Sequence, residues 1–408
     1  MLYNICSNRF IYLICIINLI IMGRVKVDID KKTNLSILQI LSMDGRSTLD
    51  FIGQQVGLKK HPVYRRIKML EQEYGIRYLA EIDLEKLGYF GYIALVKFRN
   101  KIPNRNDLKN AFEKEPHTQL VLFTTGKYDL VIYLVSNSHK DIAYLIYKLR
   151  TETRLADYPA DWYLTPYSTP NFVPVRNEFF QLLANKVWKR TKNKRRPESG
   201  DIVEREFVLL KELNKDGSLN FTELDKSIGF KQGNSRYTYY KLKDKGILKR
   251  ITISMDKLPI KYNAIIIIDD YYGSKSVKNR PILLQELIKD GPIINKYAQI
   301  SEIGIPAGAL LILPVFNEGD LKSTEDELGR KVSGIDIEHM IVNEIIIGSL
   351  AYRRFDKTYT NQYKLLAEEY KLIKPVKEII YDHNPIRNSK SNKLITFPAN
   401  ANNKGNSD

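Results

Sequence analysis

A cluster of basic and aromatic residues between positions 59 and 68 has the clearest chemical potential in this sequence. Its members are Lys59, Lys60, His61, Tyr64, Arg65, Arg66 and Lys68. Arginine can donate two hydrogen bonds to guanine O6 and N7, and lysine side chains and the amides at a helix start can bind phosphate. The cluster therefore has the chemistry to bind double-stranded DNA. A charge run alone is more often a solvated helix face. The predicted elements around the cluster are therefore needed to choose between DNA binding and a solvated face.

Residues 44–76 predict the elements that would position this cluster, namely two helices joined by a tight turn. Ser47 followed by Asp50 resembles a capping box, Gly57 marks the turn, and Pro62 falls in the first turn of the second helix. Apolar residues recur at helical spacing and give each helix one face for a shared core: Leu49, Ile52, Val56, Val63, Ile67 and Leu70. The pattern is typical of a helix-turn-helix with a basic outer face.

Composition favours a globular protein with an anionic partner. The 408 residues are 43% hydrophobic, which is enough for packed cores. The formal net charge of +17 favours a polyanionic partner, with nucleic acid the leading candidate and a membrane surface the second. Both cysteines, Cys6 and Cys15, lie near the start, so the rest of the chain has neither disulfides nor thiolate metal sites. This distribution fits a reducing cytoplasm, the location that we expect.

An apolar segment precedes the first predicted helix. Residues 10–22 are shorter than the roughly 20 residues that a membrane-spanning helix needs, and no small-residue cleavage site follows them. We therefore expect a leader over 1–22 that is not translated, a start at Met22, and no membrane partner. A DNA-binding protein tethered to a membrane is the alternative.

The spacing of hydrophobic residues changes after residue 90. A helix from Asp30 to Met43 completes the first three-helix unit, and residues 76–84 alternate as a short strand or wing. The following segments then predict the β-α-β-β-α-β order of a ferredoxin-like domain: 92–98, 104–115, 119–124, 129–135, 139–150 and 161–167.

Residues 28–168 resemble the Lrp/AsnC family of leucine-responsive and asparagine-linked transcription regulators. The resemblance rests on Asp28 and Asp30, DGR at 44–46, VGL at 56–58, V-x-R-R-I-x-x-L-E at 63–71 and G-x-Y-D at 126–129. It implies an N-terminal DNA-binding domain and a C-terminal domain for ligand sensing and oligomerisation. It also implies homo-oligomers that form through the sensor domains. Where family members often carry Ser and Pro after VGL, this chain has Lys59 and Lys60.

The same landmarks return at one offset of 172 residues, which predicts an internal duplication. The repeated landmarks are DG at 216–217, IGFK at 228–231 and Leu242, matching DG at 44–45, VGLK at 56–59 and Leu70. Asn220 with Glu223 again signals a helix cap. A second sensor-like domain follows, with elements expected at 262–269, 281–290, 295–302, 309–315, 318–330 and 335–347.

The second helix-turn-helix has fewer cations and more tyrosines on its outer face. The residues equivalent to the first cluster are Lys231, Gln232, Asn234, Arg236, Tyr237, Tyr240 and Lys241. The tyrosines either contact DNA or make the helix a packing surface, and the sequence favours neither.

The turn at Gly126, Tyr128 and Asp129 is a candidate effector-binding site. The resemblance implies that an amino acid or related small molecule binds near this turn, between sensor domains. The alternative is a plain hairpin, because a two-residue turn between strands favours glycine. In the second copy the corresponding segment, 304–308, has neither Tyr nor Asp, so an identical ligand is not expected there.

We expect no enzyme activity, no cofactor and no metal. The five histidines lack metal-ligand spacing, and no phosphate-binding or dinucleotide motif occurs. Two alternatives remain. The first is an enzyme, because sirohaem decarboxylases resemble the same two-domain family. If the chain were such an enzyme, His117, His139 or His339 would contact the tetrapyrrole. The other is an architectural protein that coats DNA with little sequence preference.

The sequence thus predicts an α+β protein in which winged helix-turn-helix domains alternate with ferredoxin-like (βαββαβ) sensor domains, in duplicate. The expected divisions after the leader are 23–78, 79–168, a connecting helix and basic linker at 169–200, 201–255, 256–355, and a helix with a disordered tail at 356–408. The expected function is sequence-specific transcription regulation.

Overall fold

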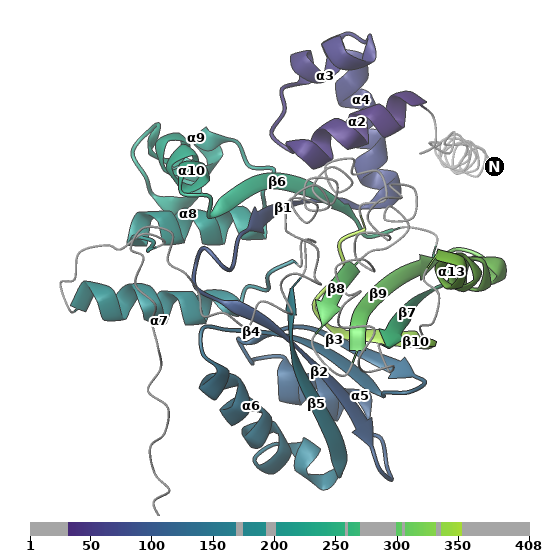
Figure 1. Ribbon diagram of the computed structural model, residues 1–408. Helices are drawn as coiled ribbons and strands as arrows, with labels where there is room; N and C mark the ends of the chain where they lie inside the picture. Colours follow the sequence, from purple (N-terminus) through teal and green to yellow (C-terminus); the bar gives the residue numbers. More distant parts are fainter. Residues whose placement is uncertain are drawn as a thin grey trace, which may run out of the picture.

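The computed structural model describes residues 32–168, 174–192, 201–257, 260–269, 299–303, 307–331 and 336–352. It comprises two three-helix units, a small sheet between them and a large closed sheet beneath (Figure 1). The expectations for the leader, for the helix at 281–290, and for the helix and tail at 356–408 lie outside the described residues. So does the basic linker from 193 to 200.

Each three-helix unit is called a head here. Head 1 consists of α2 (Lys32–Met43), α3 (Leu49–Val56) and α4 (Lys60–Tyr74). Head 2 consists of α8 (Glu204–Lys215), α9 (Phe221–Ile228) and α10 (Asn234–Asp244). Both heads have the expected helix order, and the apolar stripe Val63, Ile67 and Leu70 is buried. One cap differs from expectation: Thr48 caps α3, not Ser47 with Asp50.

A wing sheet of two strands joins the heads. Strand β1 (Ile76–Ile82) follows head 1, β6 (Leu248–Met255) follows head 2, and the two pair antiparallel. A glycine with positive φ precedes each wing strand, Gly75 at 60° and Gly246 at 69°. Because these glycines mark equivalent positions and Ala80 pairs with Ile251, the wing sheet has approximate two-fold symmetry.

The wing strands also exchange core residues between the heads. Ala80 and Ile82 of β1 pack in the hydrophobic core of head 2, together with Leu224 and other residues of its helices. Reciprocally, Ile253 and Met255 of β6 pack in the core of head 1. Neither core is complete without the other half of the chain, so the two heads form one folded unit.

The large sheet closes on itself through eight strands in the order β10-β3-β4-β2-β5-β8-β9-β7. The strands are β2 (Phe90–Phe98), β3 (Thr118–Thr125), β4 (Leu130–Ser136), β5 (Ala160–Ser168), β7 (Tyr262–Asp269), β8 (Gln299–Ile303), β9 (Ala307–Val315) and β10 (Asp336–Ile347). Each set of four has the ferredoxin-like order. The sets join where β3 pairs with β10 and β5 pairs with β8.

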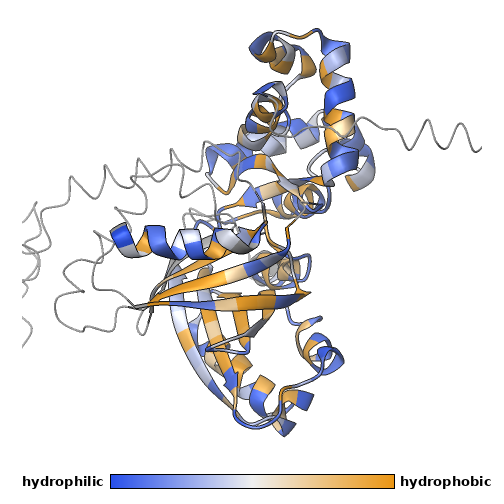
Figure 2. Ribbon diagram, turned by 90° about the vertical axis from the view of Figure 1, so that its right-hand side faces the viewer, coloured by the Kyte–Doolittle hydropathy of each residue, from blue (hydrophilic) through white to orange (hydrophobic). Residues whose placement is uncertain are grey.

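Helices cover the outside of the closed sheet. The described ones are α5 (Arg105–Phe112), α6 (His139–Thr151), η1 (Arg154–Asp157) and α13 (Glu318–Lys331), with α7 (Phe179–Lys192) leading toward head 2. In β2, Ile93 and Leu95 face the interior of the sheet, whereas Tyr92, Ala94 and Val96 face α5 and α6. Burial on both faces explains why these strands are almost continuously hydrophobic (Figure 2). None of the described helices is long and apolar enough to span a bilayer.

Candidate nucleic-acid interface

Local interactions fix the turn between α3 and α4. The Thr48 side chain accepts a hydrogen bond from the Phe51 amide at 3.2 Å and starts α3. Gly57 ends it with φ of 70°, a conformation that L side chains rarely adopt. The chain then turns so tightly that a Cβ on Gly53 would lie 2.4 Å from the Leu58 carbonyl oxygen. Position 53 therefore requires glycine.

The turn directs one face of α4 outward. The predicted contacts that are exposed on or just before this helix are Lys59, Lys60, His61, Tyr64, Arg65 and Lys68. Tyr64, Arg65 and Lys68 lie opposite the buried stripe, as the helical spacing predicted, and the other three lie at the start of α4. The outward face is cationic and includes a half-exposed tyrosine, so it can offer hydrogen-bond donors to an acidic groove.

Three predicted DNA contacts make hydrogen bonds within head 1. The first is the exposed Lys60, whose Nζ donates to Asp50 Oδ2 of α3 at 3.5 Å. The Arg66 guanidinium is half-buried and donates to Asn34 Oδ1 of α2 at 3.2 Å, which directs it toward the flank of the head. The Lys68 ammonium donates to Glu71 Oε2 at 2.6 Å, and this hydrogen bond raises the pKa of Lys68. Lys68 stays half-exposed and charged.

Head 2 has the same helix arrangement with a different outward surface. A capping box between Asn220 and Glu223 starts α9, as expected, and Gly229 ends it with φ of 78°. Tyr237 and Tyr240 are 66% and 49% exposed. Lys231, Gln232 and Arg236 are also exposed, and Asn234 is half-buried. This outward surface is more aromatic and less basic than that of head 1.

Lys241 of head 2 is held by an acidic partner inside the head. Its Nζ lies 3.0 Å from Glu206 Oε1, and Lys245 Nζ lies 2.7 Å from Glu206 Oε2. Burial acts to raise the pKa of Glu206, but the hydrogen bonds from Lys245, Val203 and Lys241 outweigh it, so the pKa is lowered. Part of the cationic charge of α10 is therefore neutralised within the head.

Arg46 connects the heads at the end of the DGR motif. Its guanidinium carbon lies 4.3 Å from the centre of the Phe221 ring and 5.2 Å from that of Tyr239, and Nη2 donates to the Leu219 carbonyl at 2.5 Å. Burial lowers the pKa of Arg46. The position matching Arg46 in the second copy is Ser218, so this contact has no symmetric counterpart among the described residues.

A buried ion pair crosses the wing sheet. Arg250 Nε lies 2.6 Å from Glu81 Oε2, with side chains 8% and 5% exposed. The two residues are directly opposite in the strand register. Their symmetric counterparts, Leu79 and Thr252, carry no charge, so the pair distinguishes one wing from the other.

The candidate effector turn lies where the two halves of the closed sheet meet. A Cβ on Gly126 would approach Met340 Cγ of β10 to 2.9 Å. The Tyr128 amide donates to Met340 Sδ at 3.4 Å, and the Tyr128 side chain is buried. Asp129 is buried as well and accepts hydrogen bonds from the Phe98 amide at 2.8 Å and Lys97 Nζ at 2.9 Å. These contacts make the turn a junction between the halves.

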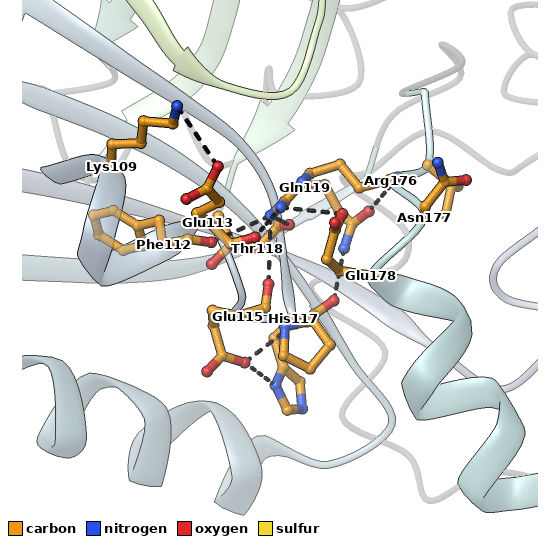
Figure 3. Close-up of polar contacts among 12 residues, drawn as sticks. Lys109, Phe112, Glu113, Glu115, His117, Thr118, Gln119, Arg176, Asn177 and Glu178 are labelled. Atoms are coloured by element: carbon orange, nitrogen blue, oxygen red, sulfur yellow. Dashed lines mark hydrogen bonds and ion pairs between the residues drawn. The ribbon is translucent and has the colours of Figure 1, made fainter. Parts of the chain in front are cut away.

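The segment after the first sensor domain is held by Arg176 (Figure 3). Its Nη1 donates to the carbonyl oxygens of Phe112 at 3.3 Å and Thr118 at 2.8 Å. One residue earlier, the Val175 carbonyl accepts from Asn214 Nδ2 of head 2 at 3.0 Å. The segment therefore connects the end of α5 and the start of β3 directly to head 2.

Three histidines considered for tetrapyrrole contact do not converge. His117 precedes β3 and bonds Glu115 at 2.8 Å (Figure 3), and this interaction offsets burial and lowers the pKa of Glu115. His139 starts α6 and bonds the Tyr92 hydroxyl at 2.7 Å. His339 lies in β10 and contacts Glu325 at 2.7 Å. It is two residues before Ile341, which pairs with Thr125 at the end of β3 opposite to His117. Within the described residues, no three His, Cys, Asp or Glu side chains could share a metal.

A groove of about 1290 Å³ separates head 1 from head 2 and the closed sheet. Tyr64 and Lys68 of α4 line one side, and Asn214 and Asn220 of head 2 line the other. The groove is bounded by Tyr78, whose hydroxyl donates to Glu71 at 3.0 Å. The inner edge of the α4 surface is thus open rather than covered by the second head.

Curated relatives of this chain are transcription regulators. It is 31% identical over 121 residues to the HTH-type transcriptional regulator FL11 of Pyrococcus horikoshii, covering 29% of this chain and 77% of the relative. The FL11 regulator of Pyrococcus furiosus is 30% identical over 116 residues, 28% of this chain and 74% of the relative. The LrpA regulator of Pyrococcus horikoshii is 26% identical over 149 residues, 36% of this chain and 99% of the relative. The chain belongs to the Lrp/AsnC family.

As an Lrp/AsnC regulator, the chain is a DNA-binding transcription regulator, and head 1 carries the helix-turn-helix. No family model matches it. Solved structures similar to it include a transcriptional regulator of Neisseria meningitidis in complex with L-Met, at 24% identity and a TM-score of 0.29, covering 33% of this chain and 88% of that one. Another is the sirohaem decarboxylase NirDL, at 13% identity and a TM-score of 0.48, covering 82% of this chain and 98% of that one.

Proposed function

We propose that this Lrp/AsnC regulator is an internal duplication in which one polypeptide supplies two DNA-binding heads and two sensor domains. Three observations support the proposal. The wings of the two heads pair with each other, each wing strand completes the core of the opposite head, and the two halves of the closed sheet have the same strand order. One chain would then have the arrangement that two separate chains would otherwise form.

The exposed face of α4 is the observation that best supports specific DNA binding. We propose that α4 enters the major groove. Arg65 would then contact base edges, and Lys59 and Lys60 would bind phosphates. His61, Tyr64 and Lys68 extend the same surface, while Arg66 would contribute from the flank. In head 2, Arg236, Tyr237 and Tyr240 would read the second half-site.

Genome-wide mapping of the occupied DNA in the native cell tests this function, followed by footprinting on an enriched site. Because the two outward surfaces differ, we expect an asymmetric site with half-sites about 10 base pairs apart. Replacing Lys59 and Lys60 by Ala should weaken binding to all sequences. The slope of log K against log salt should become shallower by roughly 0.9 per lost phosphate contact. Equal occupancy of unrelated sequences would favour an architectural protein instead.

We propose an amino acid or related small molecule as the effector, bound at the junction near Gly126, Tyr128 and Asp129. Thermal-shift screening of amino acids tests this, because a ligand at 100 times its Kd stabilises by about 2.7 kcal/mol. The Asp129→Ala variant should lose the ligand-induced shift, measured relative to its own ligand-free melting temperature. Gly308→Ala in the second half is the matched control and should keep the shift. A wild-type protein that responds to no compound would contradict effector control.

The sensor domains are also the proposed surface for association between copies of this chain. Native mass spectrometry across protein concentrations would give the number of chains in each assembly. A strictly monomeric protein that occupies both half-sites would show that one chain is sufficient.

A further inference from the structure

The amino ends of the two recognition helices differ in one residue that the proposed interface does not use. In head 2, Asp225 of α9 is 5% exposed and points at the start of α10. Its Oδ2 accepts a hydrogen bond from the Gly233 amide at 2.7 Å, and its Oδ1 accepts one from the Ser235 amide at 2.8 Å. Two amides at the helix start are therefore already bonded to a carboxylate.

In head 1 no side-chain carboxylate bonds the amides at the described start of α4, and Asp50 of α3 contacts only the Lys60 side chain there, at 3.5 Å. The position equivalent to Asp225 is Gly53, because each residue lies four positions before the glycine that ends its helix, Gly57 or Gly229. The cap residue of α4, Lys59, makes no side-chain cap hydrogen bond. The amino end of α4 therefore differs from that of α10 in both charge and hydrogen bonding.

The backbone of head 2 is adjusted to accommodate Asp225. Helix α4 begins at Lys60, whereas α10 begins at Asn234, two residues later than the equivalent position 232. The intervening Gly233 has φ of 84°, and its amide donates to the Asp225 carboxylate. A side chain at Gly53 of head 1 would instead collide with the Leu58 carbonyl. The two heads have thus adopted alternative local structures at the same point.

The chemistry of this point matters because a helix start binds anions. Its unpaired amides and the positive end of the helix dipole favour a negative group, and a DNA phosphate and a carboxylate compete for the same amides. Hydrogen bonds from Ser235 and Gly233 offset the burial of Asp225 and lower its pKa, so the group is a carboxylate at neutral pH. Its negative charge would also repel a phosphate.

We propose that Asp225 occupies the phosphate-binding position of the second recognition helix and so makes the two heads bind DNA unequally. Head 1 would supply most of the affinity, through α4 and its lysines. Head 2 would add sequence preference through Arg236, Tyr237 and Tyr240 without a phosphate at its helix start. This inference rests on the proposed DNA-binding mode of the heads.

The Asp225→Asn variant of the full chain tests this inference. Asparagine keeps one oxygen for an amide but removes the negative charge. We expect DNA affinity to increase by roughly threefold or more and the slope of log K against log salt to steepen by up to about 0.9, the value for one phosphate contact. Asp225→Ala, which leaves both amides without a side-chain partner, is a second variant, and circular dichroism with thermal melting shows that each variant folds.

Glu223→Gln is the matched control. It removes one negative charge from the same helix but keeps an oxygen for the Asn220 amide, which Glu223 bonds at 2.8 Å. We expect its affinity to change less than twofold and its salt slope to stay constant. If both Asp225 variants equal Glu223→Gln in affinity and slope, the inference is wrong although the protein binds DNA. If the wild-type chain and the Lys59 and Lys60 variant both lack DNA affinity, the proposed binding mode itself fails.

Discussion

Head 1 and head 2 have the same three helices, the same glycine positions after the second and third helices, and wing strands that pair with each other. Their polar residues differ at nearly every equivalent point. Buried Asn34 of α2 corresponds to Glu206 of α8, and Gly53 corresponds to Asp225. The backbone positions that close the turns are thus preserved, while the charges differ. This comparison indicates that one scaffold can hold two different surfaces, each with its own internal ion pairs.

The largest expected effect concerns the buried ion pair that joins the heads. Replacing Arg250 by Leu leaves Glu81 buried in the wing sheet without its cation, which should cost about 3–5 kcal/mol of the free energy of unfolding. Denaturant unfolding measures the loss. The double variant Glu81→Leu, Arg250→Leu is the control and should recover most of the stability, because two apolar side chains would then face each other. An unchanged unfolding midpoint in the single variant would show that this ion pair does not contribute to holding the heads together.

A smaller effect should separate the two outward surfaces. Arg65→Ala should cost on the order of 1–3 kcal/mol of binding free energy and relax preference only in the half-site of head 1. Arg236→Ala is the matched change in head 2 and should relax the other half-site. Binding curves on DNA with one altered half-site at a time measure both. Loss of preference in both half-sites from one substitution would contradict separate reading heads.

The smallest expected effect is a difference in acid sensitivity. The pKa of Glu206 is lowered in the folded state, so its stabilising contribution is complete above the unfolded pKa near 4.5. That contribution is lost as the pH falls through the lower folded-state pKa. The protection of backbone amides against hydrogen exchange, corrected for the intrinsic rate at each pH, should therefore decrease in head 2 before head 1 as the pH falls below about 4.5. Glu206→Gln should reduce this difference, and Asp225, whose pKa is also lowered, accounts for the remainder. Earlier opening of head 1 in the wild-type protein would reverse the comparison.

Sequence patterns predicted the elements that depend on local spacing. The apolar repeat at Val63, Ile67 and Leu70 gave the correct buried face of α4, and Asn220 with Glu223 gave the correct cap of α9. The cap of α3 was misplaced by one residue, because Ser47 and Thr48 are adjacent and have the same hydroxyl chemistry. Local signals thus specify an element more reliably than its first residue.

Contacts between the halves could not be predicted, because they join residues far apart in the sequence. Arg46 belongs to a motif that resembles other family members, yet its guanidinium bonds the carbonyl of Leu219, 173 positions later. The constant offset predicted two equivalent heads but not that their wings pair. No sequence pattern indicated the role proposed for Asp225 either, because that role depends on the turn at Gly233. The residue roles assigned to the DNA and effector surfaces stay predictions.

The closed sheet and the paired wings have a consequence for how this regulator can change. In an assembly of identical chains, every substitution appears at both equivalent positions, so an improvement for one half-site is imposed on the other. Here each head is encoded separately, and a substitution alters one of them alone. If both heads bind DNA as proposed, a single chain would therefore have a direction along the DNA, with a distinguishable front and back. A gene on one side of its site would meet a different protein face from a gene on the other.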